Sequence, residues 1–161
     1  MNLHQRINAF TKLGAFLSQF ATVEPVKVET VDHNDIFFDG FNHQLKLAKE
    51  HNGWFTPKNL AFALNGWAES LTPKSLDLWL KAYNFDAVSP QQVAIIMAGN
   101  IPLVGFHDFI SVLISGHDVL VKQSSNDKHI LPYLAKYLEY VEPGFKGKIT
   151  FTEGKLTDFD A

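Results

Sequence analysis

The chain has 161 residues, of which 46% are hydrophobic and 19% charged, a length and composition typical of one soluble globular domain rather than a disordered segment. Its formal net charge of -3, without a block of basic residues, argues against nucleic acid as a partner. No apolar run approaches the roughly 20 residues that a membrane span requires, and the start of the chain lacks a signal-peptide core, so we expect a cytoplasmic protein without a membrane span.

The region 1–90 is predicted to be mainly helical. Apolar side chains recur at helical spacing between residues 7 and 20, whereas the β-branched residues of segment 23–31 favour extended chain. Thr56 and Thr72 each place a capping hydroxyl before a proline suited to the first helical position. Two helices should therefore begin at these threonine–proline pairs.

A strand–helix–strand pattern follows. Segment 84–90 should end the helical region, and residues 93–97 form an apolar run without polar alternation, as expected of a strand covered on both faces in a parallel sheet. Residues 103–115 carry apolar side chains at three- and four-residue spacing and predict a helix that a glycine closes. Residues 118–122 predict a second strand, which a right-handed crossover would place parallel to the first, and residues 148–154 predict a third strand and an exit turn.

The turn Gly99-Asn100-Ile101-Pro102, between the first strand and the helix, allows two interpretations. A glycine here lets the backbone approach a ligand, and the amides at a helix amino terminus favour negative charge. Alternatively, the turn is an ordinary connection in which Asn100 caps the helix and Pro102 lies near its first position. Lys122 likewise ends a strand at the carboxyl edge of the expected sheet, where it either contacts a ligand or is solvated.

Three short motifs occur in this region in a fixed order. Asn100-Ile101-Pro102 follows the first strand, Ser115-Gly116-His117-Asp118-Val119 leads into the second, and Lys122-Gln123-Ser124-Ser125 ends it. This order resembles the nucleotide-binding segment of the aldehyde dehydrogenase superfamily, and more closely the acyl-CoA reductase branch related to the fatty acid reductase of bacterial bioluminescence. The resemblance implies an α/β fold, in which a mainly helical region at 1–90 is followed at 91–161 by a partial Rossmann-like nucleotide-binding unit of aldehyde dehydrogenase type.

The resemblance also implies roles for individual residues. Asn100 would donate its side-chain amide to the oxyanion formed at the acyl carbon. Lys122 would contact the adenosine ribose of the cofactor, and Gly99, Ser124 and Ser125 would complete the cofactor-binding set. An acidic residue three places after the lysine favours the unphosphorylated cofactor in this family, so the hydroxyl of Ser125 at that place favours NADP(H).

Enzymes of this superfamily hold the acyl group as a thioester on a cysteine that lies well after the matched segment, and this chain contains no cysteine. We therefore expect an amino-terminal fragment of a longer reductase, without the catalytic domain and inactive by itself. The parent enzyme would use NADPH to reduce acyl-CoA or another fatty acyl thioester to an aldehyde, by way of an acyl-cysteine intermediate. Assembly into a homo-oligomer is compatible with this expectation.

Two other functions stay open from the sequence. The same α/β unit could serve as a non-catalytic protein-interaction module, which the missing cysteine favours, or as a nucleotide sensor without catalysis. No metal site is expected, because the seven histidines form no pair at i, i+4 helical spacing. The acidic segment 32–35 is predicted to be a turn, since apolar residues follow it where a calcium loop needs oxygen ligands.

Overall fold

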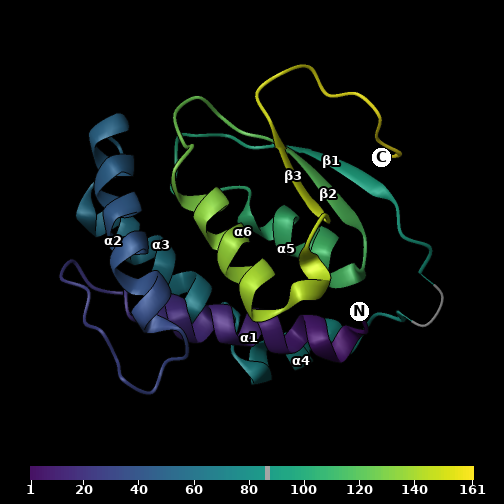
Figure 1. Ribbon diagram of the computed structural model, residues 1–161, viewed down its shortest axis with the longest axis horizontal. Helices are drawn as coiled ribbons and strands as arrows, with labels where there is room; N and C mark the ends of the chain where they lie inside the picture. The colour runs from purple at the N-terminus through teal and green to yellow at the C-terminus, as the bar shows by residue number, and fades with distance from the viewer. Residues whose placement is uncertain (86–87) are drawn as a thin grey trace.

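The computed structural model describes residues 1–85 and 88–161, in which helices pack against a small sheet (Figure 1). The helices are α1 (Leu3–Ser18), α2 (Asn34–His51), α3 (Pro57–Ser70), α4 (Pro73–Leu80), α5 (Phe106–Ser115) and α6 (Ile130–Val141), and one turn of 3-10 helix, η1, spans Pro143–Phe145. The strands are β1 (Gln92–Ile96), β2 (Asp118–Lys122) and β3 (Ile149–Thr152). The predicted α/β class with a helical amino-terminal part is therefore confirmed.

Both helix starts predicted from a threonine–proline pair are present. Thr56 and Thr72 each accept a hydrogen bond at 3.2 Å from the backbone N–H three residues further on, and α3 and α4 begin at the prolines that follow. Proline fixes a helical φ and lacks an N–H that would otherwise be unpaired, so local residues alone determine these starts. The predicted linker 84–90 follows α4, and its residues 86–87 lie outside the described part of the chain.

Segment 23–31, predicted to be extended, forms no strand; it is a loop between α1 and α2 with bends or turns at residues 23–24 and 29–31. Two buried side-chain amides hold it. Gln19 and Asn34 bond to each other at 2.7 and 2.8 Å, and Gln19 Oε1 also accepts from the N–H of Val28 at 2.8 Å. Side-chain amides thus satisfy backbone groups that a neighbouring strand would pair with in a sheet, which a β-branched composition cannot reveal.

The three strands form a parallel sheet in the order β1-β2-β3, as the crossover rule predicts. Both crossovers run in the same direction, so α5 and α6 lie on the same side of the sheet (Figure 1). Val119 and Val121 of β2 are fully buried against them, whereas Ile96 of β1 is 75% exposed. The prediction that residues 93–97 are covered on both faces is therefore wrong for the described chain, since both crossover helices cover one face only.

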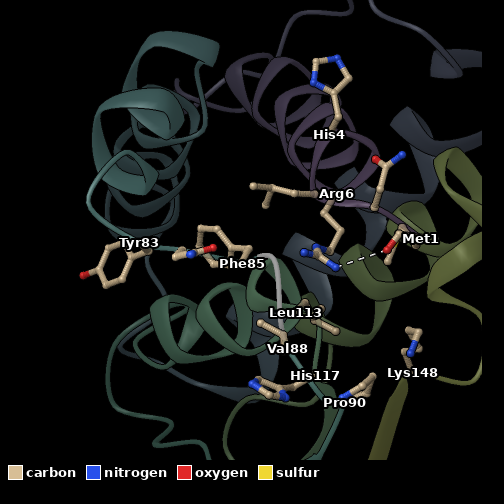
Figure 2. A pocket seen from close by; sticks show the side chains of 14 residues that line it. Met1, His4, Arg6, Tyr83, Phe85, Val88, Pro90, Leu113, His117 and Lys148 are labelled. Carbon is tan, nitrogen blue, oxygen red and sulfur yellow. Dashed lines mark hydrogen bonds between the residues drawn. The ribbon is translucent and has the colours of Figure 1, made fainter.

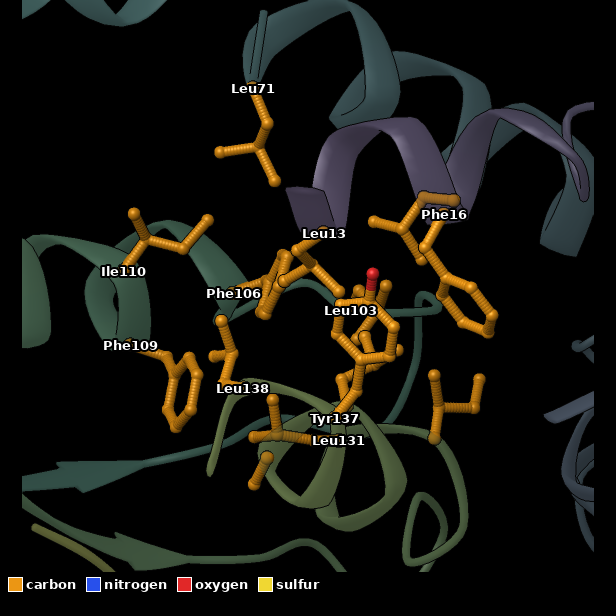
Figure 3. Close-up of a cluster of buried hydrophobic side chains, with 14 of the residues drawn as sticks. Leu13, Phe16, Leu71, Leu103, Phe106, Phe109, Ile110, Leu131, Tyr137 and Leu138 are labelled. Atoms are coloured by element: carbon orange, nitrogen blue, oxygen red, sulfur yellow. The ribbon is translucent and has the colours of Figure 1, made fainter. Parts of the chain in front are cut away.

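One hydrophobic core joins the amino-terminal helices to the sheet (Figure 3). Phe16 of α1 stacks on Tyr137 of α6 with ring centroids 4.5 Å apart, and within α5 the rings of Phe106 and Phe109 stack at 5.7 Å. Leu13 of α1 lies between these two pairs of rings in the same cluster. Because aromatic side chains bury large apolar areas, this core fixes the sheet relative to α1.

Candidate functional site

The residues predicted to form a site lie at the carboxyl edge of the sheet. Gly99 and Asn100 belong to the turn after β1, Lys122 is the last residue of β2, and Ser124 and Ser125 follow it. Because β1 and β2 are parallel neighbours, both turns leave the sheet side by side, at the edge where open α/β sheets bind ligands. The fold therefore brings the predicted residues to one edge.

At Gly99 the two turns are in close contact. A β-carbon on Gly99 would lie 2.8 Å from Ser124 Cβ and closer still to its hydroxyl oxygen, which close-packed side chains do not tolerate. The Ser124 hydroxyl accepts a hydrogen bond from the backbone N–H of Asn126 at 3.2 Å, which holds it in this place. The packing of one turn on the other therefore requires glycine at this position, whatever ligand the edge binds.

The carboxyl end of α2 fastens both turns through two residues that no sequence motif marks. The buried amide of Asn52 donates to the Gly99 carbonyl at 2.8 Å and to the Asn126 carbonyl at 3.3 Å. Beside it, His51 Nε2 lies 2.9 Å from the Ser125 carbonyl oxygen, to which a protonated ring nitrogen donates. Their place at the end of a helix, directly before a glycine, is the one signal that the sequence offers.

The turn after β1 is longer than predicted. The helix predicted from residue 103 begins as α5 at Phe106, with Gly105 as its N-cap. Leu103 is buried and has a φ of 57°, in the left-handed region, which interrupts a helix and costs a residue with a β-carbon about 1–2 kcal/mol. The interpretation in which Asn100 caps the helix and Pro102 is near its first position is therefore wrong.

Asp127, a partly buried carboxyl group that the sequence did not single out, connects this turn to the next helix. The backbone amides of Leu103 and Ile130, the first residue of α6, both interact with it. Burial raises the pKa of Asp127 to about 6, and the two amides, which favour the anion, offset only part of that change. Its Oδ1 has no hydrogen-bond partner among the described residues. A carboxyl group that titrates near neutral pH thus lies next to the candidate site.

Asn100 is exposed, and within residues 1–85 and 88–161 its side-chain amide makes no hydrogen bond. It lines a cavity of about 260 Å³ together with side chains from the region where α3 begins. Two of these, Trp54 and Phe62, are 75% and 82% exposed. An unpaired amide donor beside exposed apolar surface can bond to an oxygen atom of a ligand whose hydrocarbon part packs on the rings.

Lys122 lies on the open face of the sheet. Val119 and Val121 are buried beneath the helices, and side chains alternate along a strand, so Lys122 points to the other side. Its ammonium group forms no ion pair with a described residue, and Ser125 is exposed three residues further on. The charge of this lysine is therefore available to a ligand at the carboxyl edge.

The end of the chain runs along the outer edge of β1, the edge that faces away from β2 (Figure 1). Ala161 donates its N–H to the Gln92 carbonyl at 3.4 Å and accepts at 2.7 Å from the N–H of Ala94. Bonding of one residue to the two that flank its opposite number is the pattern of parallel strands. β1 therefore pairs with β2 on one side, and on the other side it bonds to the last two residues, which follow β3.

Residues 37–150 match the family model for acyl-CoA reductase (LuxC). The chain belongs to this family. The matched segment runs from α2 into β3, so this LuxC-family match contains both turns of the candidate site and the helix end that fastens them. Family membership confirms the resemblance that the motifs after β1 and β2 indicate, and relates the chain to oxidoreductases that act on acyl-CoA. No curated protein and no solved structure matches the chain.

Two features are absent from the part of this LuxC-family chain that the structure describes. None of its helices there is both long and apolar enough to cross a membrane. No three His, Asp or Glu side chains there lie close enough together to hold a metal ion. The ring centroids of His51 and His129 lie 5.6 Å apart, and burial, with a smaller contribution from His51, lowers the pKa of His129. The turn predicted at 32–35 is present at residues 32–33 only; the prediction is wrong for residues 34–35, which begin α2.

Proposed function

We propose that this LuxC-family chain belongs to an NADP(H)-dependent acyl-CoA reductase, which reduces a fatty acyl thioester to an aldehyde. The chain would supply the oxyanion donor and the cofactor edge, by which we mean the carboxyl edge of the sheet at Gly99, Lys122 and Ser125. One observation carries the proposal: an amide donor, Asn100, and a cation, Lys122, neither of which is paired with a described residue, lie at the same carboxyl edge of a parallel sheet. The family gives acyl-CoA as the substrate class. The parallel β1-β2-β3 sheet, with residues after β3 bonded to the free edge of β1, supports a Rossmann-like unit of aldehyde dehydrogenase type, because dinucleotide-binding sheets add a later strand at that edge.

The residues at this edge suit a dinucleotide that carries a 2′-phosphate. Lys122 offers a positive charge, and the exposed hydroxyl of Ser125 neither repels nor competes with a phosphate as a carboxylate would. Gly99 and Ser124 keep the two turns close together, which leaves backbone rather than long side chains at the edge. When bound, the cofactor would supply a hydride to the acyl carbon.

Asn100 would act on the acyl group itself. Attack on a thioester carbonyl places negative charge on its oxygen, and an amide N–H already directed at that position stabilises the charge without reorganisation. The exposed rings of Trp54 and Phe62 beside Asn100 suit the hydrocarbon part of a fatty acyl chain, since burying apolar area on both sides is favourable. The substrate would thus lie with its carbonyl at Asn100 and its chain along the start of α3.

The acyl-accepting thiol is not among these residues, because the 161 residues contain no cysteine. We infer that a cysteine elsewhere in the enzyme attacks the thioester. A bond forms between its sulfur and the acyl carbon, the bond to the CoA sulfur breaks, and CoA leaves as the thiol with one proton. On this proposal the 161 residues bind cofactor without catalysing reduction.

Calorimetric titration of the chain with NADPH and, separately, NADH tests the cofactor proposal. We expect NADPH to bind more tightly, and Lys122→Ala to weaken it at least about tenfold, because a hydrogen bond to a charged group contributes about 1.5–3 kcal/mol. Lys136→Ala, which removes an exposed lysine of α6, is the matched control and should leave the affinity unchanged. Equal losses in both variants contradict the role of Lys122, and equal affinity for the two cofactors contradicts the phosphate preference.

A second candidate function, a non-catalytic protein-interaction module, is favoured by the apolar surface that β1 leaves open at Ile96. A parallel sheet normally has both faces covered, so a protein partner could occupy this one. The same titration separates the two functions. A folded chain that binds neither cofactor would favour the interaction module.

A further inference from the structure

A larger cavity lies at the opposite end of the strands from the candidate site. Its volume is about 860 Å³, and among the described residues it is bordered by the start of α1, by residues 83–85 and 88 after α4, and by residues that precede the strands (Figure 2). Pro90, His117 and Lys148, which come shortly before β1, β2 and β3, all line it. The cavity is therefore separate from the carboxyl edge at which Asn100 and Lys122 lie.

Arg6, the only arginine of the chain, projects into this cavity from α1 (Figure 2). The residue is only 8% exposed. Its Nη1 donates to the Met1 carbonyl at 3.3 Å, whereas Nε has no hydrogen-bond partner among the described residues. Within the same residues no carboxylate pairs with it, and burial lowers its pKa. A buried cation without a counter-charge is costly, since its lost hydration is not replaced.

The helix ends beside Arg6 do not supply this counter-charge. Arg6 lies near the amino terminus of α1, where the free N–H groups disfavour a cation and the first turn contains no acidic residue. On its other side it approaches the carboxyl end of α5, where a β-carbon on Gly116 would lie 2.8 Å from Nη1. The carbonyls at that end favour a cation, yet the guanidinium donates no hydrogen bond to them. The two helix ends therefore act on the guanidinium in opposite directions, and neither contributes an acidic side chain to it.

The remaining walls suit an anion with an apolar part. The backbone N–H of Gln91 donates to His117 Nδ1 at 3.1 Å, so the ring hydrogen of a neutral His117 is on Nε2, which can donate. The described residues that line the cavity include no Asp or Glu, and Lys148 is paired with Asp118. Leu113 of α5 contributes apolar wall. A negative group in the cavity would thus meet the guanidinium of Arg6 and the ring of His117 as donors, with apolar side chains such as that of Leu113 beside them.

We propose that this cavity binds a small anion, a phosphate or carboxylate group either free or carried by an organic molecule, through the terminal nitrogens of Arg6. A guanidinium presents parallel N–H groups that match the oxygen atoms of carboxylate and phosphate. The bound anion supplies a counter-charge that residues 1–85 and 88–161 do not provide. The site goes beyond the proposed reductase function, because it shares no residue with the cofactor edge or with the cavity beside Asn100.

Thermal unfolding with added anions tests the site, because a ligand that binds only the folded chain raises Tm by mass action. Phosphate at about 100 times its Kd should raise Tm by about 5–11 °C in a domain of this size. Sodium chloride at the same ionic strength corrects for general screening. Acetate and hexanoate distinguish the sources: a shift with phosphate alone supports a phosphate ligand, and a larger shift with hexanoate than with acetate supports an organic carboxylate.

Arg6→Met keeps the length of the side chain and removes its charge, so it should abolish the anion-dependent shift. Lys58→Met, which removes one positive charge from the exposed surface of α3, should retain it. A wild-type Tm that no anion raises above the chloride baseline overturns the proposal. A shift of equal size in Arg6→Met also overturns it.

A measurement on the unmodified chain keeps the test independent of how well Arg6→Met folds. Because the chain contains one arginine, its nitrogen-15 NMR spectrum has a single arginine Nε–H signal. Phosphate titrated at constant ionic strength should move this signal along a saturating curve, while the indole signals of Trp54 and Trp79, which do not line the cavity, stay in place. An Arg6 signal that does not move, or that drifts in step with the indoles, overturns the anion site.

Discussion

Replacing Gly99 with alanine tests the close contact between the two turns of the candidate site. The added β-carbon would lie 2.8 Å from Ser124 Cβ and 3.0 Å from Asn126 Cβ, and neither atom is the movable end of a long side chain. Overpacking of this kind costs about 1–3 kcal/mol. Because 1 kcal/mol corresponds to about 2–4 °C in a domain of this size, we expect Tm to fall by about 2–12 °C.

Two further variants isolate the cause of that loss. Gly66 lies inside α3 with no described atom within 4 Å of an added β-carbon, so Gly66→Ala should stabilise the chain by about 0.5–1 kcal/mol. Ser124→Gly, made together with Gly99→Ala, removes the nearest obstructing atoms and should recover a large part of the loss. Urea unfolding of the four members of this double-mutant cycle gives the coupling energy, which should exceed about 0.5 kcal/mol. A Gly99→Ala variant as stable as wild type, or a cycle without coupling, would refute the close contact.

Two predictions concern Asp127 and Asn100. The pKa of Asp127 in the folded chain, about 6, lies above its ordinary value of 3.8, so the folded chain holds more protons between these values and its stability should fall as the pH rises through them. A rise of about 2 pKa units corresponds to about 3 kcal/mol. Asp127→Asn should therefore stabilise the chain by up to that amount at neutral pH and by little below about pH 4. Urea unfolding that shows the same stabilisation at both pH values would contradict this prediction. In the active reductase, Asn100→Ala should lower kcat by about two to three orders of magnitude. Asn65→Ala, which removes an exposed amide of α3, is the control and should leave kcat unchanged. Near-normal turnover of the Asn100 variant would rule out the oxyanion role.

Features determined by a few consecutive residues could be predicted from the sequence. The threonine–proline starts of α3 and α4 formed as expected, because a cap and a fixed φ act locally. The start of α5 could not be predicted in the same way. Apolar spacing from residue 103 favours a helix, whereas Leu103 has a left-handed backbone. Its side chain is buried and its N–H bonds to Asp127, and no neighbouring residue in the sequence indicates these contacts.

Features that depend on contacts between residues far apart in the chain could not be predicted from the sequence. Gly99, Asn100 and Lys122 could be assigned to one edge because parallel strands end together. What fastens that edge, the amide of Asn52, acts across the fold and has no local pattern. The same holds for Arg6, whose single occurrence in the sequence gives no sign that it is buried without a counter-charge. An apolar strand likewise has the same sequence whether one or both of its faces are covered.

The attachment of α2 to the candidate site has a consequence for the order of folding. The hydrogen bond from Asn52 to Gly99 joins residues 47 positions apart, and those from Asn52 and His51 to the loop after β2 span 74 positions. Closing such loops costs entropy that only later packing offsets, so long-range contacts of this kind tend to form after local ones. We therefore expect the helices and the β-α-β unit to form first, and the two turns to reach their final shape only when α2 docks. The amino-terminal helices thus complete the assembly of the site. In a chain in which α2 has not docked, the two turns at the carboxyl edge would lack the hydrogen bonds from His51 and Asn52.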